Sequence, residues 1–199
     1  MKDNQRTQAA RSAATREALV AAARSLFAQH GFGEVGTETI VRAAGVTRGA
    51  LYHHFADKTE LYAAVFEAVE AEVIGRIAET VASSGEPDLI VVMRLGASTW
   101  LDACAEPEIY RIVLLDAPAV LGWARWREIG ERYGMGLVQG LLAQAVDTGR
   151  IARQPVAPLA HVLLGALREG ALYMAGAQDQ AEARQEVGAA IDRLIDSLG

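Results

Sequence analysis

Apolar residues recur at helical spacing along most of the chain, and no convincing stretch alternates in the manner of a β-strand. Leu19, Ala23 and Phe27 lie about one turn apart in the first such segment, and Ile191 and Ile195 do so in the last. Alanine and leucine, which favour helices, are abundant. The sequence therefore predicts an all-α fold with about nine helices.

The expected helices are separated by short polar or proline-containing joints. All five prolines fall at the edges of periodic segments, where a fixed φ and a missing N–H suit the first turn of a helix. The helices are expected at residues 11–30, 38–44, 48–54, 58–82, 88–105, 108–116, 119–148, 156–176 and 181–198. The fourth would reach about 37 Å at about 1.5 Å per residue, long enough to bridge a small N-terminal module and a larger C-terminal bundle.

The composition is typical of a globular protein. With 199 residues, 51% of them hydrophobic, the chain can bury a sizeable core, and 22% charged residues argue against disorder. A single cysteine cannot form an internal disulfide, and no Cys/His cluster has metal-ligand spacing. No signal-like segment follows the N-terminus, and no uncharged run approaches the roughly 18 residues needed to span a bilayer. We therefore expect a soluble cytoplasmic protein with no cofactor, metal or membrane contact.

The net charge of −6 is unevenly distributed along the chain. Residues 1–58 hold eight Lys or Arg against five acids, which leaves nine net negative charges on residues 59–199. A mildly basic head on an acidic body is what a DNA-binding module joined to a second module would show. This division predicts two domains, residues 1–58 and residues 59–199.

Residues 31–61 read GFGEVGTETIVRAAGVTRGALYHHFADKTEL and predict two short helices held at an angle. Thr37 and Thr47 can cap them, and Gly45 supplies the left-handed residue that a helix-turn-helix corner needs. One side of the second helix is apolar. The residues left to face outward are Arg48, Gly49, Tyr52 and His53. An exposed arginine and tyrosine, with a glycine that permits close approach, suit a DNA major groove, and Lys58 at the start of the next helix can reach a phosphate.

Fourteen positions in this stretch follow a known pattern: Gly31, Phe32, Thr37, Ile40, Ala44, Gly45, Val46, Gly49, Leu51, Tyr52, His54, Phe55, Lys58 and Leu61, preceded by Leu26-Phe27. In this order and spacing they resemble the DNA-binding domain of the TetR family of transcriptional regulators. The resemblance implies an N-terminal three-helix helix-turn-helix domain followed by a C-terminal helical bundle for ligand binding and dimerisation. The C-terminal half of that family varies widely, so nothing specific about a ligand follows.

The resemblance also implies roles for individual positions. The base-reading positions are Arg48, Gly49 and Tyr52, with His53 at their flank. The positions that contact the DNA backbone are Thr37, Thr47, His54 and Lys58. The basic residues before the first helix, Lys2, Arg6 and Arg11, either track phosphates or a minor groove or belong to a disordered arm.

Three features of this segment also have a plainer interpretation. His54 beside Phe55 fits a semi-buried histidine, a role compatible with DNA contact. The His53-His54 pair is not expected to bind metal, because neighbours on a helix point about 100° apart. Residues 31–36 match the dinucleotide pattern G-x-G-x-x-G, but they follow a helix rather than a strand, which excludes that fold.

A single helix-turn-helix contacts few bases, so specificity favours two copies on a palindrome about one helical turn apart. The last two helices supply the expected dimer interface: Val162, Leu163, Ala166, Leu167, Gly170 and Met174 on the eighth, and Val187, Ile191, Leu194, Ile195 and Leu198 on the ninth. The alternative is that these stripes face only the core of the monomer.

A ligand pocket is expected among the middle helices, where large aromatics lie near glycines. Its expected residues are Met93, Trp100, Cys104, Tyr110, Trp123, Trp126 and Tyr133. Aromatics beside missing side chains can line a cavity for a small, largely apolar molecule, although an ordinary core explains them equally well. The polar residues that could orient a ligand are Asp102, Arg111, Asp116 and Arg168.

These observations predict a homodimeric repressor that binds a palindromic operator in double-stranded DNA. A small, largely apolar effector is expected to release it from the operator. The resemblance implies that this release occurs through a tilt of the fourth helix. One alternative is a ligand-independent or partner-controlled regulator, an activator included. A less favoured one is an all-α small-molecule carrier or enzyme. No nucleophile elbow, HExxH, P-loop or CxxC motif occurs, so no enzyme is expected.

Overall fold

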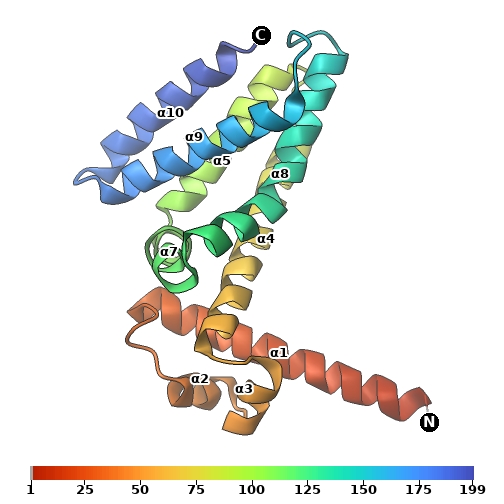
Figure 1. The fold of residues 1–199 in the computed structure, drawn as a ribbon, viewed down its shortest axis with the longest axis vertical. Coiled ribbons are helices and arrows are strands. Elements are labelled where there is room, and N and C mark those ends of the chain that lie inside the picture. The colour runs from red at the N-terminus through yellow and green to blue at the C-terminus, as the bar shows by residue number, and fades with distance from the viewer. Residues whose placement is uncertain (1) are drawn as a thin grey trace.

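The computed structural model describes residues 2–199, with side chains described from residue 8 onward, and consists of helices joined by short loops (Figure 1). The α-helices are α1 (Lys2–His30), α2 (Thr37–Ala44), α3 (Arg48–His54), α4 (Lys58–Ser84), α5 (Leu89–Ala105), α6 (Pro107–Ile109), α7 (Ala117–Leu121), α8 (Trp123–Asp147), α9 (Val156–Gly176) and α10 (Gln180–Asp196). A π-helical segment, η1 (Tyr110–Asp116), connects α6 to α7. Residues 2–199 contain no strand, so the all-α prediction is confirmed.

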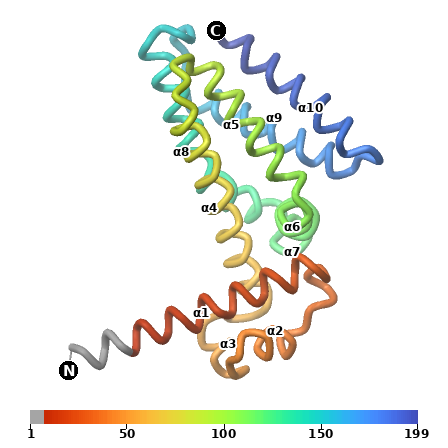
Figure 2. Tube along the Cα trace, turned by 180° about the vertical axis from the view of Figure 1, so that it is seen from behind, coloured from red at the N-terminus to blue at the C-terminus, as the bar shows by residue number. Residues whose placement is uncertain are grey.

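The helices form a small N-terminal module and a larger body, with α4 running from one into the other (Figure 1). The module consists of α1, α2 and α3, and the C-terminus lies at the far end of the body. Figure 2 shows α6 and α7 at the junction, beside the C-terminal end of α1. This arrangement confirms the expectation that the fourth helix bridges the two parts. No helix within residues 2–199 has both the length and the apolar character to cross a membrane.

The bridging helix α4 is defined by clear signals at both ends. At its start, the Asp57 carboxylate accepts a hydrogen bond from the backbone N–H of Glu60 at 2.8 Å. At its end, Gly85 takes the left-handed conformation with φ 63°. Between these caps, Leu61 and Phe66 are fully buried because α1 packs against the first part of α4 and α5 and α8 pack against the rest.

The structure departs from the expected boundaries in three places. The helix expected over 119–148 is wrong as a single element, because Gly122 separates α7 from α8 with φ 78° and ψ 153°, a conformation that is open essentially only to glycine. The segment expected at 108–116 is mostly the π-helix η1. Helix α1 begins at Lys2 rather than near residue 11, so the expected N-terminal arm is helical.

Candidate nucleic-acid interface and cavity

The corner between α2 and α3 forms as the sequence predicts, with one exception. Gly45 has φ 67° and its N–H bonds to the Arg42 carbonyl, which closes α2. The Thr47 hydroxyl accepts a hydrogen bond from the Ala50 N–H at 3.2 Å and so caps α3. The predicted cap on α2 is wrong: Gly36 occupies that position without a side-chain bond, and Thr37 is the first helical residue.

Helix α3 has one buried and one exposed side. Leu51 is fully buried, whereas 44% of the Tyr52 surface and 62% of the Arg48 side chain remain exposed. Gly49 and His53 are also exposed. The predicted outward face of this helix is therefore accessible along its length.

The guanidinium of Arg48 has two neighbours on the module itself. Its Nη1 donates to Glu38 Oε1, on α2, at 3.0 Å, and its central carbon lies 5.5 Å from the centre of the Tyr52 ring. Both charged side chains are mostly exposed, so solvent weakens this ion pair. Arg48 is thus held beside Glu38 and Tyr52 but can exchange Glu38 for another acceptor.

The two remaining basic candidates near α3 are partly engaged in the protein. The Lys58 ammonium donates to the carbonyls of Phe32 at 2.9 Å and Val35 at 3.0 Å and lies 4.0 Å from the Phe32 ring centre. It therefore ties the loop before α2 to the start of α4, with one of its three hydrogens left over. His54 is half-buried, its ring centre 6.4 Å from that of Phe55.

A groove runs between the exposed part of α1 and α3. Arg11, Ser12 and Thr15 line it from α1, and Gly49 and His53 from α3. Arg11 is exposed, so a phosphate could reach it from this groove. The side chains of Lys2 and Arg6 lie outside the described residues.

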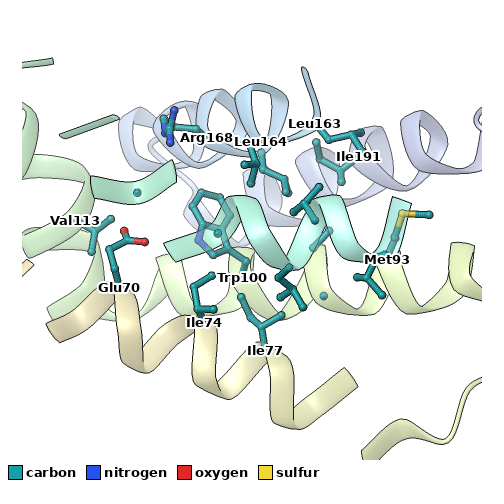
Figure 3. Close-up of a pocket in the computed structure, with 18 of the residues that line it drawn as sticks. Glu70, Ile74, Ile77, Met93, Trp100, Val113, Leu163, Leu164, Arg168 and Ile191 are labelled. Atoms are coloured by element: carbon teal, nitrogen blue, oxygen red, sulfur yellow. The ribbon is translucent and has the colours of Figure 1, made fainter. Parts of the chain in front are cut away.

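The body contains a cavity of about 100 Å³ between α4, α5, η1, α8, α9 and α10 (Figure 3). It is lined by Phe66, Glu70, Ile74, Ile77, Met93, Gly96, Ala97, Trp100, Val113, Leu114, Trp126, Gly130, Gly134, Leu137, Val138, Leu141, Leu163, Leu164, Leu167, Arg168, Ile191 and Ile195. All of these are apolar or glycine except Glu70 and Arg168. Gly130 and Gly134 leave room on α8: a Cβ on Gly130 would lie 3.2 Å from Arg168 Nη2.

The structure brings three of the seven expected pocket residues to this cavity, namely Met93, Trp100 and Trp126. The other four lie elsewhere and correct the expectation. Cys104 is 2% exposed in the core, and burial raises the pKa of its thiol. The Tyr110 hydroxyl donates to the Ala175 carbonyl at 3.1 Å.

The two remaining residues, Trp123 and Tyr133, both belong to α8 and do not line the cavity. Trp123 is 54% exposed, because the break at Gly122 leaves it as the first residue of α8 at the surface. Tyr133 lies about 100° around the helix from Gly134, which lines the cavity.

Of the four polar residues considered for orienting a ligand, only Arg168 lines the cavity. Asp102 pairs with Arg184 at 2.8 Å, and Asp116 accepts a hydrogen bond from the Phe32 N–H at 2.9 Å. Arg111 approaches the backbone at Gly31. Glu70, which also lines the cavity, was not among the residues predicted from the sequence. Its signal was an acid placed among the apolar positions of α4, one turn after Phe66 and two turns before Ile77.

Segment η1 joins the cavity to the N-terminal module. Val113 lines the cavity, and its carbonyl accepts a hydrogen bond from Trp126 Nε1 at 2.9 Å. One residue earlier, the Ile112 carbonyl accepts from the Tyr62 hydroxyl, on α4, at 2.6 Å. At the end of η1, Asp116 holds the Phe32 N–H. One short element therefore contacts the cavity wall, α4 and the loop before α2.

Part of the apolar stripes assigned to a dimer interface is buried within the chain itself, and the more exposed part stays a prediction. Five of the named residues are buried within the chain: Leu163, Met174, Val187, Ile191 and Ile195. The cause is the packing of α9 against α10, which is so close that a Cβ on Gly170 would lie 2.7 Å from Val187 Cγ1. The half-buried residues are Ala166, Leu167, Gly170, Leu194 and Leu198, and Val162 is 60% exposed.

Comparison with known families assigns both parts of the chain. A family model described as the tetracyclin repressor-like C-terminal domain matches residues 90–198, and one described as bacterial regulatory proteins of the tetR family matches residues 19–65. The crystal structure of a TetR-family transcriptional regulator from Pectobacterium atrosepticum is 33% identical, with a TM-score of 0.85 over 95% of this chain and 96% of that one.

Two further relatives are more distant or match over a shorter segment. The transcriptional repressor AcnR of Corynebacterium efficiens is 39% identical over 80 residues, which is 40% of this chain and only 39% of that protein. RolR, solved in complex with resorcinol, shares the fold at 20% identity and a TM-score of 0.75, over 94% of this chain and 89% of that one. Because the C-terminal family model alone covers more than half of the sequence, the chain belongs to the TetR family of bacterial transcriptional regulators.

Proposed function

We propose that this protein is a DNA-binding transcriptional repressor that acts as a homodimer on a palindromic operator and leaves it when a small, largely apolar ligand enters the cavity. The observation that carries the proposal is the exposed face of α3, on which the Arg48 guanidinium lies over the Tyr52 ring and both side chains remain accessible to solvent. In this proposal residues 1–58 bind DNA, and residues 59–199 bind the ligand and the second subunit.

Base reading is assigned to the exposed face of α3. Arg48 can donate two hydrogen bonds to the edge of a guanine once it leaves Glu38, and Gly49 lets the helix approach the groove closely. Tyr52 and His53 extend this face toward the end of the helix. The backbone-contacting residues are Thr37, Thr47, His54 and Lys58, together with the helix N-termini that Thr37 and Arg48 begin.

Dimerisation is assigned to the outer surface of α9 and α10. The inner stripes of these helices are occupied within the chain, so the partner must use what remains exposed. On α9 this surface includes Val162 and Tyr173, each 60% exposed, with Gly165 between them. On α10 it includes Ala189 and Ala190. Small residues beside exposed large ones allow two copies of a helix pair to approach closely.

Coupling is assigned to α4 and η1. Both contribute to the cavity wall and both reach the N-terminal module. A ligand that lowers operator affinity a thousandfold must bind the released conformation better by about 4 kcal/mol, at about 1.4 kcal/mol per decade. Contacts to these two moving elements can supply such a difference, whereas contacts to a rigid wall cannot.

The decisive experiment is footprinting of the purified full chain on DNA flanking its own gene. We expect protection of two half-sites about one helical turn apart. Arg48→Ala and Tyr52→Ala should each abolish or strongly weaken this protection while leaving thermal unfolding nearly unchanged. Arg153→Ala, which removes an exposed arginine from the body, is the matched control and should protect DNA like the parent. Protection that survives both α3 substitutions would falsify the assignment of this face.

A further inference from the structure

Glu70 is an unpartnered acid in an otherwise apolar wall. It is 7% exposed, and its carboxylate points into the cavity (Figure 3). No group among residues 8–199 donates a hydrogen bond to it, and burial raises its pKa to about 7, an effect that Arg168 partly offsets. A buried carboxyl without a donor is costly, so its place in this wall calls for a polar group on whatever occupies the cavity.

Arg168 supplies the second polar group at the same end of the cavity (Figure 3). Its side chain is only 14% exposed, and its guanidinium carbon lies 5.1 Å from the Trp126 ring centre. Its nearest carboxylate oxygen, on Glu131, is 3.9 Å away, beyond hydrogen-bonding distance. Arg168 therefore retains donors that can be directed into the cavity.

Glu70 and Arg168 influence each other electrostatically but form no ion pair within the described part of the chain. A ligand at this end of the cavity thus meets an acceptor from α4 and a donor from α9. A cation would be repelled by Arg168, and an anion by Glu70 in its ionised form. A hydroxyl suits both, because one O–H donates to the carboxyl while the oxygen lone pairs accept from the guanidinium.

The remaining wall and the volume limit the rest of the ligand. About 100 Å³ is of the same order as the roughly 150 Å³ of an apolar cavity that takes benzene, so the ligand is limited to about one ring. Figure 3 shows the side chains of Ile74, Ile77 and Met93 lining the part of the cavity beyond Glu70. This part offers dispersion contacts and no polar partner, which fits a single hydrocarbon ring.

We infer that the ligand of this cavity is a neutral molecule of about one ring that carries a hydroxyl, which donates to Glu70 and accepts from Arg168. The inference rests on the proposed function insofar as it takes this cavity to be the effector site. It adds the chemical class of the effector and the two residues that select it.

Isothermal titration calorimetry of the full chain tests the inference with four single-ring probes: phenol, benzene, benzylamine and benzoate. Phenol is neutral at pH 7. We expect phenol to bind about tenfold or more tightly than benzene and more tightly than either charged probe. Equal affinities of phenol and benzene, tighter binding of benzylamine or benzoate, or no binding of phenol would each overturn the inference. This comparison needs no variant and so does not depend on the folding of one.

Variants then assign the preference to the two residues. In Glu70→Leu and in Arg168→Met the advantage of phenol over benzene should fall to within about twofold, because each change removes one partner of the hydroxyl. The matched control is Glu79→Leu, the same substitution at an exposed position of α4, which should retain the parent preference. Retention of the preference in both cavity variants would also overturn the inference.

A separate measurement keeps the inference distinct from the proposed function. Operator binding is titrated by fluorescence anisotropy with and without phenol. Release of DNA by phenol but not by benzene supports both the inferred ligand class and the proposed control of DNA binding by the ligand. Phenol that binds with the expected pattern yet leaves DNA affinity unchanged overturns effector control and leaves the ligand class intact. If the protein binds its operator specifically but shows no preference for phenol over benzene, the inferred ligand class is wrong and the proposed DNA-binding function stands.

Discussion

The indole N–H of Trp126 donates to the carbonyl of Val113 at 2.9 Å, and both residues line the cavity. This bond fixes η1 against α8 in the wall of the cavity. Segment η1 also accepts a hydrogen bond from Tyr62 of α4, and its Asp116 accepts one from the loop before α2. We therefore expect a shift of the Trp126 ring to displace α4 and this loop.

Trp126→Phe tests this connection. The change leaves an aromatic ring in place but removes the donor, so the buried Val113 carbonyl loses its partner at a cost of about 1 to 3 kcal/mol in the free energy of unfolding. Urea denaturation measures this cost. We expect operator affinity without ligand to change little and the response to ligand to weaken. Glu128→Gln, at an exposed position of the same helix, should alter neither. If Trp126→Phe still responds fully to ligand, the bond between Trp126 and Val113 takes no part in coupling the cavity to DNA binding.

Glu70 predicts a specific pH dependence of stability. Its pKa is raised from 4.5 to about 7 in the folded protein, so the proton is held more tightly in the folded state. The contribution to stability is therefore fully present below pH 4.5 and is lost as pH rises through 7. Relative to Glu70→Gln, the parent should lose at most about 3 kcal/mol between pH 4.5 and 8.5. Urea midpoints across this range measure it. Parallel curves for parent and variant would contradict the prediction, and Glu79→Gln serves as the surface control.

Two glycines of the segment expected at 119–148 should respond to alanine in opposite directions. Gly122→Ala places a side chain at φ 78° and should destabilise the protein by about 1 to 3 kcal/mol. Gly136→Ala lies inside α8 with no atom within 4 Å of the new Cβ, and should stabilise it by up to about 1 kcal/mol. Thermal and urea unfolding of the pair measure the difference. Similar effects of the two changes would argue against the break at Gly122.

The proposed dimer surface makes a prediction about the assembly state. Val162→Glu introduces a charge into the exposed face of α9 and should shift a dimer toward monomer, because an unpaired charge at an interface is costly. Analytical ultracentrifugation at several concentrations measures the shift. Ala124→Glu, an exposed position on α8, is the control and should leave the assembly unchanged. An unchanged association constant in Val162→Glu would move the interface to another surface.

The helix-turn-helix could be predicted almost residue by residue because its signals are local. Thr47 caps α3, Leu51 anchors it and Gly45 turns the chain before it, each within a few residues of the others. The break at Gly122 could not be predicted in the same way. Several glycines occur in that segment, and packing of η1 and α7 onto α1 and α4 determines which of them takes a positive φ.

The cavity and the dimer surface were harder to predict from the sequence, for a related reason. Helical periodicity shows that a stripe is buried but not what buries it, so Leu163 and Ile191 read equally well as interface or core. Residue type singled out Trp100 and Trp126, but Tyr133, two turns along α8 from Trp126 and on nearly the same face, does not line the cavity. Glu70 was missed because an acid in a helical pattern is usually read as a surface residue.

Lys58 makes the connection between the loop before α2 and the start of α4 rigid. Its ammonium donates to the carbonyls of Phe32 and Val35 and so ties them to the first turn of α4, while Asp116 accepts from the Phe32 N–H of the same loop. If α4 tilts, these bonds are expected to move the loop before α2 together with α4, so that the angle between the loop and α4 is kept. In the proposed function, a small change in the angle of α4 would therefore displace α3 together with the rest of the N-terminal module.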